Sequence, residues 1–350
     1  MNFKRVWMMF KARNSEFFRD RAAFGWNFLF PFLIVAGFAV MFGDKNHVEY
    51  KVGIFPLAST RVDVPAHLDI PLPFKTNKYI EFLGFETKEE GLSRLTHHKI
   101  DFLIENKGKD HAYWVNETSP KGYILERLYN GSIARIHTPE TGLKGRVHGR
   151  EIRYIDWLFP GILGMNMMFS ALWGVGYVVV RYRKNGVLRR LRATPLTAVE
   201  YLTSQMLSRI FLLMFTLTVV WFGCDLFFKF QVEGSLMDLF VVFFLGSLSL
   251  SSLGLILASR GTSEEFTSGV LNFITWPMMF LSEVWFSIEG SPHWVQVIAK
   301  LLPLTHILSA ARKIISDGAN LVDVRTELGI LIVTTALFLL IGASLFSWNS

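Results

Sequence analysis

The chain has 350 residues, of which 51% are hydrophobic and 19% are charged, and it contains 32 Phe and 10 Trp. This composition is too apolar for an ordinary soluble protein, and together with the retained charge it indicates membrane spans plus a water-exposed part. The formal charge of +7 is not a nucleic-acid signal, because twelve of the 36 basic residues lie in two membrane-flanking segments, 1–21 and 181–205, and the single cysteine, Cys224, excludes an intramolecular disulfide and any multi-cysteine metal site.

Residues 1–21 place aromatic side chains near a helical period among Lys and Arg, as at Phe3, Trp7 and Phe10. This pattern predicts an amphipathic helix in the cytoplasmic interface. Residues 22–43 carry no charge and match the ~20 residues that cross a bilayer, so they are the predicted first span, kinked at Pro31. A signal peptide is disfavoured because no small-residue cleavage pattern follows this apolar run.

Residues 44–153 change character, with 17 basic and 15 acidic residues and no apolar run long enough to span. We expect a folded extracytoplasmic insert. Strand patterns and helical spacing predict a small α/β domain, with Pro-rich and Gly-rich loops and with histidines on a solvated surface instead of in a metal site. The strands are expected at 50–55, 101–105 and 112–115, the helices at 89–98 and 120–133, the loops at 65–73 and 142–149, and the histidines are His97, His98 and His111.

Residues 154–350 contain the remaining predicted spans. Glycines in the second span and serines in the fourth indicate close helix packing. Arg209 and Asp225, near the two ends of the third span, are expected to reach the interfaces by snorkelling, in preference to forming a proton relay. The five spans are predicted at 157–180, 206–228, 239–259, 266–282 and 328–346.

A basic loop, RYRKNGVLRRLRATPLTAVEYLTSQ, separates the second and third spans at residues 181–205. Its excess of Lys and Arg predicts the cytoplasmic side. Apolar residues, Leu188 and Leu191 among them, recur on one side of a short helix that Thr194 and Pro195 end, and Thr197 is placed to cap the next helix. Two readings stay open: a rigid knuckle that docks into a partner, or a basic helix on anionic headgroups.

The run from Gly186 to Leu196 resembles the signature G-T-L-E-R-L-x-A-T-P-L of ABC transmembrane type-2 proteins, the membrane (permease) subunits of ABC exporters. Here Val187 and Arg189 replace the commoner Thr and Glu, so one polar contact that the family's permeases make with their ATPase subunit is expected to differ. The resemblance implies that residues 184–196 are a coupling helix seated in a groove of a separate ATPase subunit. The implied contact residues are Gly186, Val187, Leu188, Arg189, Arg190, Leu191, Thr194, Pro195 and Leu196.

Residues 283–303 follow the fifth span, whose helix we expect Pro277 to break, and neither half of this segment is long enough to span. An outer re-entrant helical hairpin is predicted, and it resembles the short outer helices of the same family. Glu283 would lie at an exit gate, or it would be a membrane-edge acid paired with Lys300 or Arg312. The candidate residues of this outer site are Pro277, Phe280, Glu283, Trp285 and Pro303.

Together these segments predict an α-helical polytopic membrane protein with six transmembrane helices, an outer re-entrant hairpin, and an α/β extracytoplasmic domain between spans one and two. Both termini are expected to be cytoplasmic, in the plasma (bacterial inner) membrane. The sequence has no Gly-x-x-x-x-Gly-Lys-Ser/Thr run. No nucleotide site is therefore expected on this chain, and ATP and Mg would bind to the partner ATPase.

The resemblance implies an exporter permease that moves a drug-like, lipid or other hydrophobic or amphipathic molecule outward, paired with a second permease copy or a paralogue. The outer domain offers a surface to a periplasmic or envelope partner. The alternative is an ATPase-independent, membrane-anchored protein whose outer domain binds a ligand or partner. A membrane enzyme has little support, because no nucleophile, base and orienting group occur at a recognisable spacing.

Overall fold

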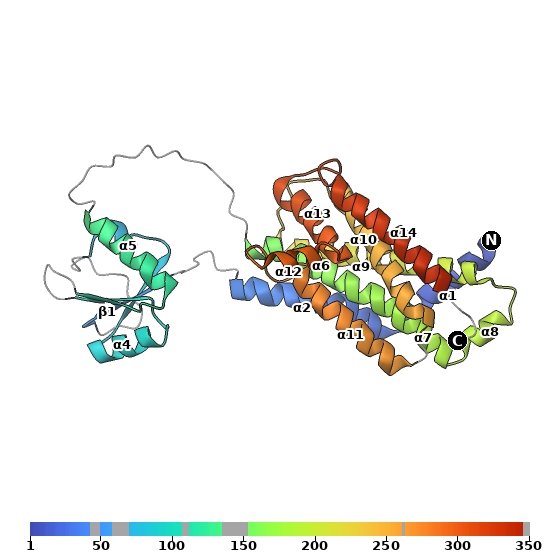
Figure 1. The fold of residues 1–350 in the computed structure, drawn as a ribbon, viewed down its shortest axis with the longest axis horizontal. Coiled ribbons are helices and arrows are strands. Elements are labelled where there is room, and N and C mark those ends of the chain that lie inside the picture. The colour runs from blue at the N-terminus through green and yellow to red at the C-terminus, as the bar shows by residue number, and fades with distance from the viewer. Residues whose placement is uncertain (43–49, 58–69, 107–111, 135–152, 261–262, 346–350) are drawn as a thin grey trace. The chain divides into compact units, whose positions relative to one another are not determined.

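A computed structural model describes residues 1–42, 50–57, 70–106, 112–134, 153–260 and 263–345. The chain divides into two compact units (Figure 1). A helical unit comprises Met1–Gly43 and Arg150–Ser350, and a second unit comprises Asp44–Gly149. The second unit is thus inserted in the sequence after the first long apolar helix.

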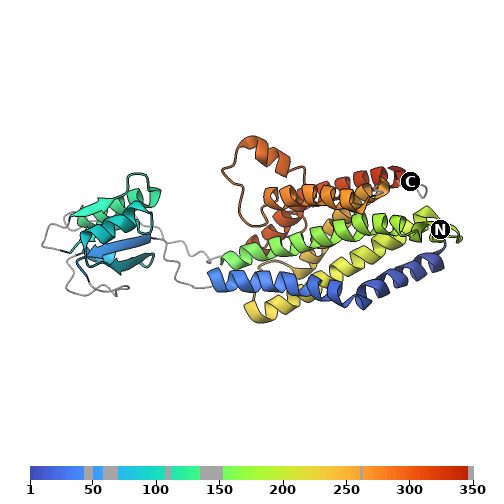
Figure 2. The same cartoon turned by 90° about the horizontal axis from the view of Figure 1, so that it is seen from below.

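The helical unit gathers the start of α1, helix α8 and the end of α14 at one end, and α12 and α13 at the other (Figures 1 and 2). Its helices in chain order are α1 (Phe3–Arg19), α2 (Arg21–Phe42), α6 (Tyr154–Leu172), the π-helical η1 (Trp173–Tyr177), α7 (Val178–Lys184), α8 (Val187–Arg192), α9 (Ala198–Phe228), α10 (Leu236–Arg260), α11 (Glu264–Leu281), α12 (His293–Ala299), α13 (Pro303–Asp317) and α14 (Arg325–Leu345).

Five helical stretches in the described part of the chain are long and apolar enough to cross a membrane, and α12 with α13 adds a sixth only if that pair, bent by 90°, is one span. The chain is therefore a polytopic membrane protein. The predicted fifth span forms helix α11 but is not among the five, so the six-span topology stays a prediction. The five are Phe24–Met41, Tyr154–Lys184, Ala198–Phe228, Leu236–Ser259 and Arg325–Leu345.

Pro277 was predicted to break the helix of the fifth span, but α11 is continuous through it. Helix α11 continues to Leu281, and the amide of Ser282 donates to the carbonyl of Met278 at 3.0 Å. Proline removes one backbone donor, and the flanking turns keep the helix intact. The chain leaves the helix at Glu283, whose φ is +60°.

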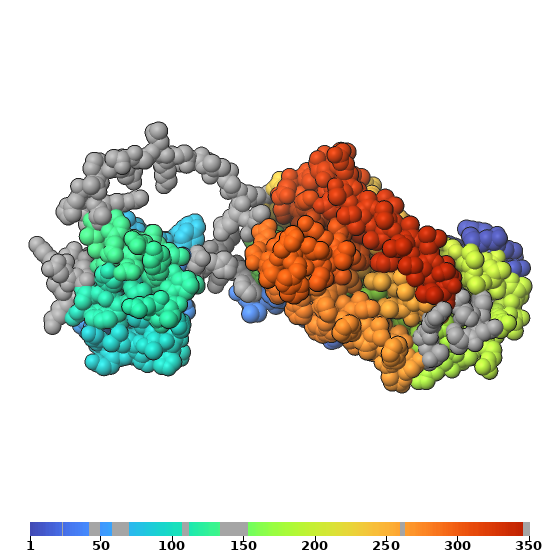
Figure 3. Space-filling view, in the orientation of Figure 1, coloured from blue at the N-terminus to red at the C-terminus, as the bar shows by residue number. Residues whose placement is uncertain are grey.

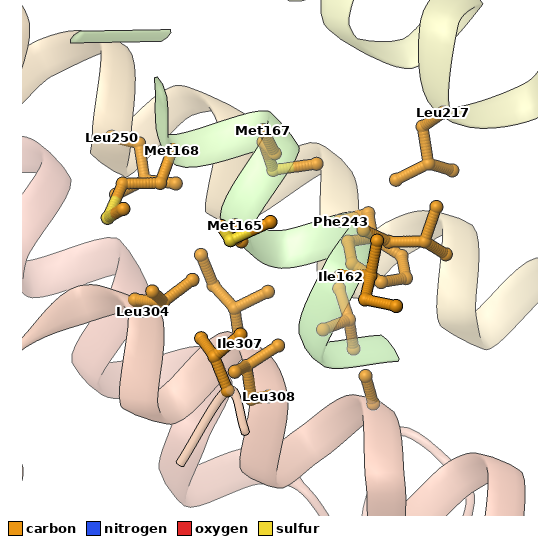
Figure 4. Packing of buried hydrophobic residues seen from close by; sticks show 14 of the residues in the cluster. Ile162, Met165, Met167, Met168, Leu217, Phe243, Leu250, Leu304, Ile307 and Leu308 are labelled. Atoms are coloured by element: carbon orange, nitrogen blue, oxygen red, sulfur yellow. The ribbon is translucent and has the colours of Figure 1, made fainter. Parts of the chain in front are cut away.

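The core of the helical unit lies between α6, α9, α10 and α13. A Cβ on Gly161 would lie 2.5 Å from the carbonyl oxygen of Val284, so this glycine allows the close approach that the sequence indicated. The hydroxyl oxygens of Ser249 and Thr334 lie 3.1 Å apart and link α10 to α14. Figure 4 shows side chains of this core, among them Met165, Met168, Phe243, Leu250, Leu304 and Leu308.

The outward faces of α11 and α14, both visible in Figure 3, remain apolar. Such faces in a membrane protein meet lipid or another membrane subunit. The large exposed side chains on these two helices include Phe273, Trp276, Ile332, Val333, Leu337 and Leu340.

The second unit is a four-stranded sheet of order β2-β1-β3-β4, in which β1 is parallel to β2 and β3, and β4 is antiparallel to β3. Helices cover both faces, because side chains of β1 and β3 are buried alternately on each. The elements are β1 (Tyr50–Phe55), α3 (Leu72–Lys75), β2 (Ile80–Gly84), α4 (Lys88–Thr96), β3 (Phe102–Glu105), β4 (Tyr113–Val115) and α5 (Pro120–Ala134).

The small α/β fold follows the sequence pattern except at β2 and α3, which were not predicted. The predicted loop at 65–73 lies mostly outside the described residues, and its last residues, Leu72 and Pro73, begin α3. The predicted Gly-rich segment at 142–149 and His111 also lie outside them. His97 and His98 are exposed, and Nδ1 of His97, the residue that caps the end of α4, lies 2.7 Å from the carbonyl oxygen of Ser93 in that helix.

Candidate coupling site

Helix α8 is a short helix held between two fixed turns. Gly186 precedes it with φ of +69°, a left-handed conformation that suits glycine. After Pro195, a capping box opens α9: the Glu200 amide donates to Oγ1 of Thr197 at 3.2 Å, and the Thr197 amide donates to the Glu200 carboxylate at 3.0 Å. The predicted helix, its end and its cap are confirmed.

The apolar side of α8 packs against the protein's own helices. Leu188 is 1% exposed and lies in a cluster with Val179, Tyr201 and Ala258, from α7, α9 and α10. The expectation that Leu188 presents itself to a partner is therefore wrong. Periodicity identifies an apolar helix face, but it does not show whether the chain's own helices or a partner protein cover that face.

The opposite side of α8 and the turn after it are exposed and cationic. We call this surface the basic ridge. Because the apolar side is occupied, the ridge is an exposed part of the predicted coupling segment that remains open to a partner or to lipid headgroups. It consists of Arg189, Arg190, Arg192, Ala193, Thr194 and Pro195.

The first turn of α1 is bonded to the far end of this ridge. The amide of Asn2 donates to Oε1 of Glu200 at 2.6 Å, and Nη1 of Arg5 donates to the carbonyl of Pro195 at 2.5 Å. The same Arg5 nitrogen lies 3.8 Å from Oε2 of Glu200. The sequence did not predict these contacts, because about 190 residues separate the partners. The local pattern around each partner indicates only a position at the membrane interface.

Glu16 fastens the other end of α1 to α7. Its Oε2 lies 2.6 Å from Nη1 of Arg13, its Oε1 lies 3.4 Å from Nη2 of Arg181, and the Tyr182 hydroxyl donates to the same carboxylate. One carboxylate thus joins two cations and a phenol from two helices.

The end of α7 is also tied to α10 and α11. Arg183 donates to the carbonyls of Ala258 and Ser259, both at 3.2 Å. Nζ of Lys184 lies 3.5 Å from Glu264 and 3.6 Å from Glu265. Contacts thus link α7 and α8 to α1, α9, α10 and α11.

The contacts of Glu16 predict a pH dependence. Burial raises the pKa of Glu16, but the hydrogen bond from Tyr182 and the charges of Arg13 and Arg181 outweigh it, so this pKa lies below its ordinary value of 4.5. A lowered folded-state pKa contributes stability that is present above the ordinary value and is lost as the pH falls through the lowered one. The unfolding temperature should fall accordingly on acidification.

The measurement is the unfolding temperature of the purified protein between about pH 6 and about pH 3. Glu16→Gln should flatten its dependence on pH. Glu289→Gln is the matched control, an exposed carboxyl distant in the sequence from this cluster, and it should keep the wild-type slope. Equal slopes in all three proteins would contradict the assignment.

The predicted outer site centres on Glu283. Of its two expected partners, the structure gives Arg312: Nη1 of Arg312 lies 3.5 Å from Oε2 of Glu283, and Nη2 donates to the carbonyl of Glu283 at 2.5 Å. Oε1 of Glu283 accepts from the amide of Ile288 at 3.1 Å. Glu283 thus has a structural role, and a gate role stays a prediction.

The other residues of the outer site lie on different elements. The carbonyl of Trp285 accepts from the Tyr154 hydroxyl at 2.6 Å, which ties this segment to the start of α6. Pro277 and Phe280 are exposed on α11, and Pro303 begins α13. Residues 283–303 therefore do not form a self-contained hairpin: α12 ends at Ala299, and α13 runs on to Asp317 inside the core.

The comparisons with known proteins point to one family. The model of the family described as ABC-2 family transporter protein matches residues 22–344. The probable multidrug ABC transporter permease YbhR of Escherichia coli K12 is 25% identical over 184 residues, 52% of this chain and 50% of the relative. The daunorubicin resistance ABC transporter permease protein DrrB1 of Streptomyces coeruleorubidus is 24% identical over 177 residues, 49% of this chain and 61% of the relative.

A eukaryotic protein is similar as well: ABC transporter G family member 20 of Dictyostelium discoideum is 24% identical over 201 residues, 56% of this chain and 27% of the relative. The matched part spans about half the length of the first two relatives. The family match, by contrast, runs from the first long apolar helix through the basic ridge to α14. The chain belongs to the ABC-2 family of transporter proteins.

Proposed function

We propose that this chain is the permease subunit of an ABC exporter of the plasma (bacterial inner) membrane. Its partners would be a separate ABC ATPase and a second permease copy or a close paralogue. The family match and the permease relatives support this proposal, as does the lack of a Gly-x-x-x-x-Gly-Lys-Ser/Thr run in the sequence. The observation that carries it is the basic ridge, exposed on one side of a helix whose other side is anchored.

In this mechanism the ATPase contacts the basic ridge, and ATP with Mg²⁺ binds on the ATPase. Closure of the nucleotide-bound ATPases displaces α8. Because Leu188 is anchored in the bundle and Arg183 and Lys184 hold α10 and α11, the displacement moves the adjoining ends of several helices together. The roles divide within one short helix: Leu188 transmits force, and Arg189 and Arg190 meet the partner.

The proposed cargo is a hydrophobic or amphipathic molecule, drug-like or lipid, moved outward. The names of the two bacterial relatives, which refer to multidrug transport and daunorubicin resistance, support this class. The proposed topology places the basic ridge and both termini in the cytosol and the α/β unit outside. The two clusters of Lys and Arg, in residues 1–21 and 181–205, support that orientation. An envelope partner for the α/β unit stays a prediction.

Cross-linking from the ridge tests the proposal. The only native cysteine, Cys224, is buried, so Ala193→Cys introduces an accessible thiol. With an ABC ATPase encoded beside this chain co-expressed in the same cells, a thiol-to-amine cross-linker on Ala193→Cys should capture that ATPase. Ser287→Cys, exposed in the outer segment after α11, is the matched control and should not.

A membrane-impermeant maleimide provides the second readout, because it should label Ala193→Cys only from the cytosolic side. Labelling of Ala193→Cys from outside the cell, or equal ATPase capture by both cysteines, would overturn the proposal. Either result would favour the alternative, a membrane-anchored protein whose α/β unit binds a ligand or partner.

A further inference from the structure

Arg209 is buried inside the membrane-spanning part of α9. It lies one turn into the apolar stretch that begins at Met206, and it is 8% exposed. The sequence predicted that this side chain reaches the interface, but it turns across the bundle, and Nη2 donates to Oγ of Ser170 on α6 at 2.6 Å. A Cβ on Gly174 would lie 2.0 Å from Cζ of Arg209, so a glycine in the π-helical η1 makes room for the guanidinium.

No carboxylate in the described part of the chain lies within ion-pair distance of Arg209, whereas the partly buried Arg312 faces Glu283 at 3.5 Å. Its Nε is buried without a hydrogen-bond partner. A charge in an apolar membrane bundle is costly to bury, and one without a counter-charge indicates a functional site.

A row of polar groups extends from Arg209 toward α2. Oγ of Ser170 donates to Oδ1 of Asn27 at 3.2 Å, and Nδ2 of Asn166 lies 3.5 Å from the carbonyl of Asn27. The row joins α9, α6 and α2. The guanidinium of Arg209 and the side-chain amides of Asn27 and Asn166 carry N–H donors that an acidic group beside the row could use.

A cavity of about 520 Å³ lies against this row, within the volume range of sites for drug-sized ligands. Arg209, Ser170, Asn27 and Asn166 form its polar part. Trp26 on α2 and Trp276 on α11 are more than half exposed at its rim. The remaining wall is apolar, formed by Met165, Met279 and the aromatic residues Trp26, Phe30, Phe169, Trp173, Trp276 and Trp285.

We propose that this cavity binds an amphipathic anion. A carboxylate, phosphate or sulfonate pairs with Arg209 beside Ser170, and the apolar body lies among the aromatic side chains. The guanidinium geometry suits a bidentate acidic group, and the same positive charge disfavours a cationic ligand that the aromatic walls alone would accept.

This inference rests on the proposed function, for which it names the substrate class: a lipophilic acid. The acidic group could belong to a membrane phospholipid or to a free amphipathic acid, and both offer the same chemistry to Arg209. A purely structural Arg209, by contrast, would join α9 to α6 through Ser170 without discriminating among ligands.

The test is tryptophan quenching in the intact permease, reconstituted with its ATPase in phosphatidylcholine nanodiscs. Four of the ten Trp residues line the cavity, and bromine quenches indole fluorescence on contact. The probes are 9,10-dibromostearate and the corresponding dibrominated alcohol, which share an apolar chain and differ in charge. The acid should quench saturably at a concentration at least about tenfold lower than the alcohol, the factor expected for one charge-assisted hydrogen-bonded pair.

Arg209→Gln should abolish this preference for the acid while leaving the weaker quenching by the alcohol. Arg209→Lys should retain part of the preference because it keeps the charge. Lys300→Gln, which removes an exposed cation elsewhere in the helical unit, is the matched control and should behave as the wild type. Competition by phosphatidylglycerol, but not by added phosphatidylcholine, would identify a lipid headgroup as the source, and failure of both to compete would identify a free acid.

Equal quenching of the wild type by acid and alcohol would overturn the inference, as would an undiminished preference in Arg209→Gln. The wild-type comparison decides the question even if Arg209→Gln does not fold. No preference for the acid in the wild type, together with intact ATPase capture by Ala193→Cys, would reject the ligand class alone. Failure of ATPase capture would reject the proposed function, whatever the cavity binds.

Discussion

Leu188→Asp should lower the free energy of unfolding by about 3 to 5 kcal/mol, the combined cost of losing a buried leucine and burying a carboxylate. Leu188 is 1% exposed and joins three helices through Val179, Tyr201 and Ala258. An aspartate there loses these contacts and brings a charge into an apolar cluster. Thermal unfolding of the purified variant, followed by tryptophan fluorescence, measures the effect as a lower unfolding temperature.

Arg190→Asp is the matched control, because it places the same charge on the exposed side of the same helix. It should leave the free energy of unfolding within about 0.5 kcal/mol of the wild type, while weakening cross-linking of the ATPase to Ala193→Cys. The two variants separate anchoring from contact. A Leu188→Asp protein that unfolds like the wild type yet loses the ATPase would show that Leu188 is a contact residue and that the anchored geometry is wrong.

The membrane helices could be predicted because their signals are local. A charge-free run of about 20 residues has few alternatives in a bilayer, and it places α2, α10 and α14 near their observed bounds. The cap of α9 is equally local: Thr197 was predicted to begin a helix, and its side chain accepts a hydrogen bond from the backbone amide three residues on.

The sequence could not show which other helix packs against each helix face. The period of α8 showed that Leu188 lies on an apolar side, but its burial depends on α7, α9 and α10 arriving at one place. Arg209 lies 39 residues from Ser170, with which it forms its hydrogen bond. Snorkelling was the reasonable local solution for an arginine near a span end. The cavity forms between residues of α2, α6, α9 and α11, which are far apart in the sequence.

The α/β unit shows the same limit on a smaller scale. Strand β2 (Ile80–Gly84) has only five residues, and its glutamate and glycine weaken the alternating pattern. It forms because β1 offers it a parallel edge, with Tyr50 opposite Ile80 and Ile54 opposite Gly84. Tertiary pairing decides such a strand, so propensity alone does not find it.

Arg312 is the second position where a single change should have a large effect. Its guanidinium lies 3.8 Å from the centroid of the Trp157 ring, donates to the carbonyl of Trp157 at 3.3 Å, and meets both the carbonyl and the carboxylate of Glu283. Glu283 itself has a left-handed φ of +60°. One cation thus joins α13 to α6 and holds the chain where it leaves α11.

Arg312→Met should therefore cost about 3 kcal/mol, because it removes these donors and leaves the Glu283 carboxylate without its cation in a mostly buried site. Adding Glu283→Gln should restore part of the loss, since the uncompensated charge is then gone, and a double-variant cycle on unfolding temperature measures that coupling. Lys300→Met, at the other partner that the sequence offered, is exposed and should change little. If Lys300→Met were the more destabilising of the two, or if the double variant were no more stable than Arg312→Met, the pairing with Arg312 would not be what holds this segment.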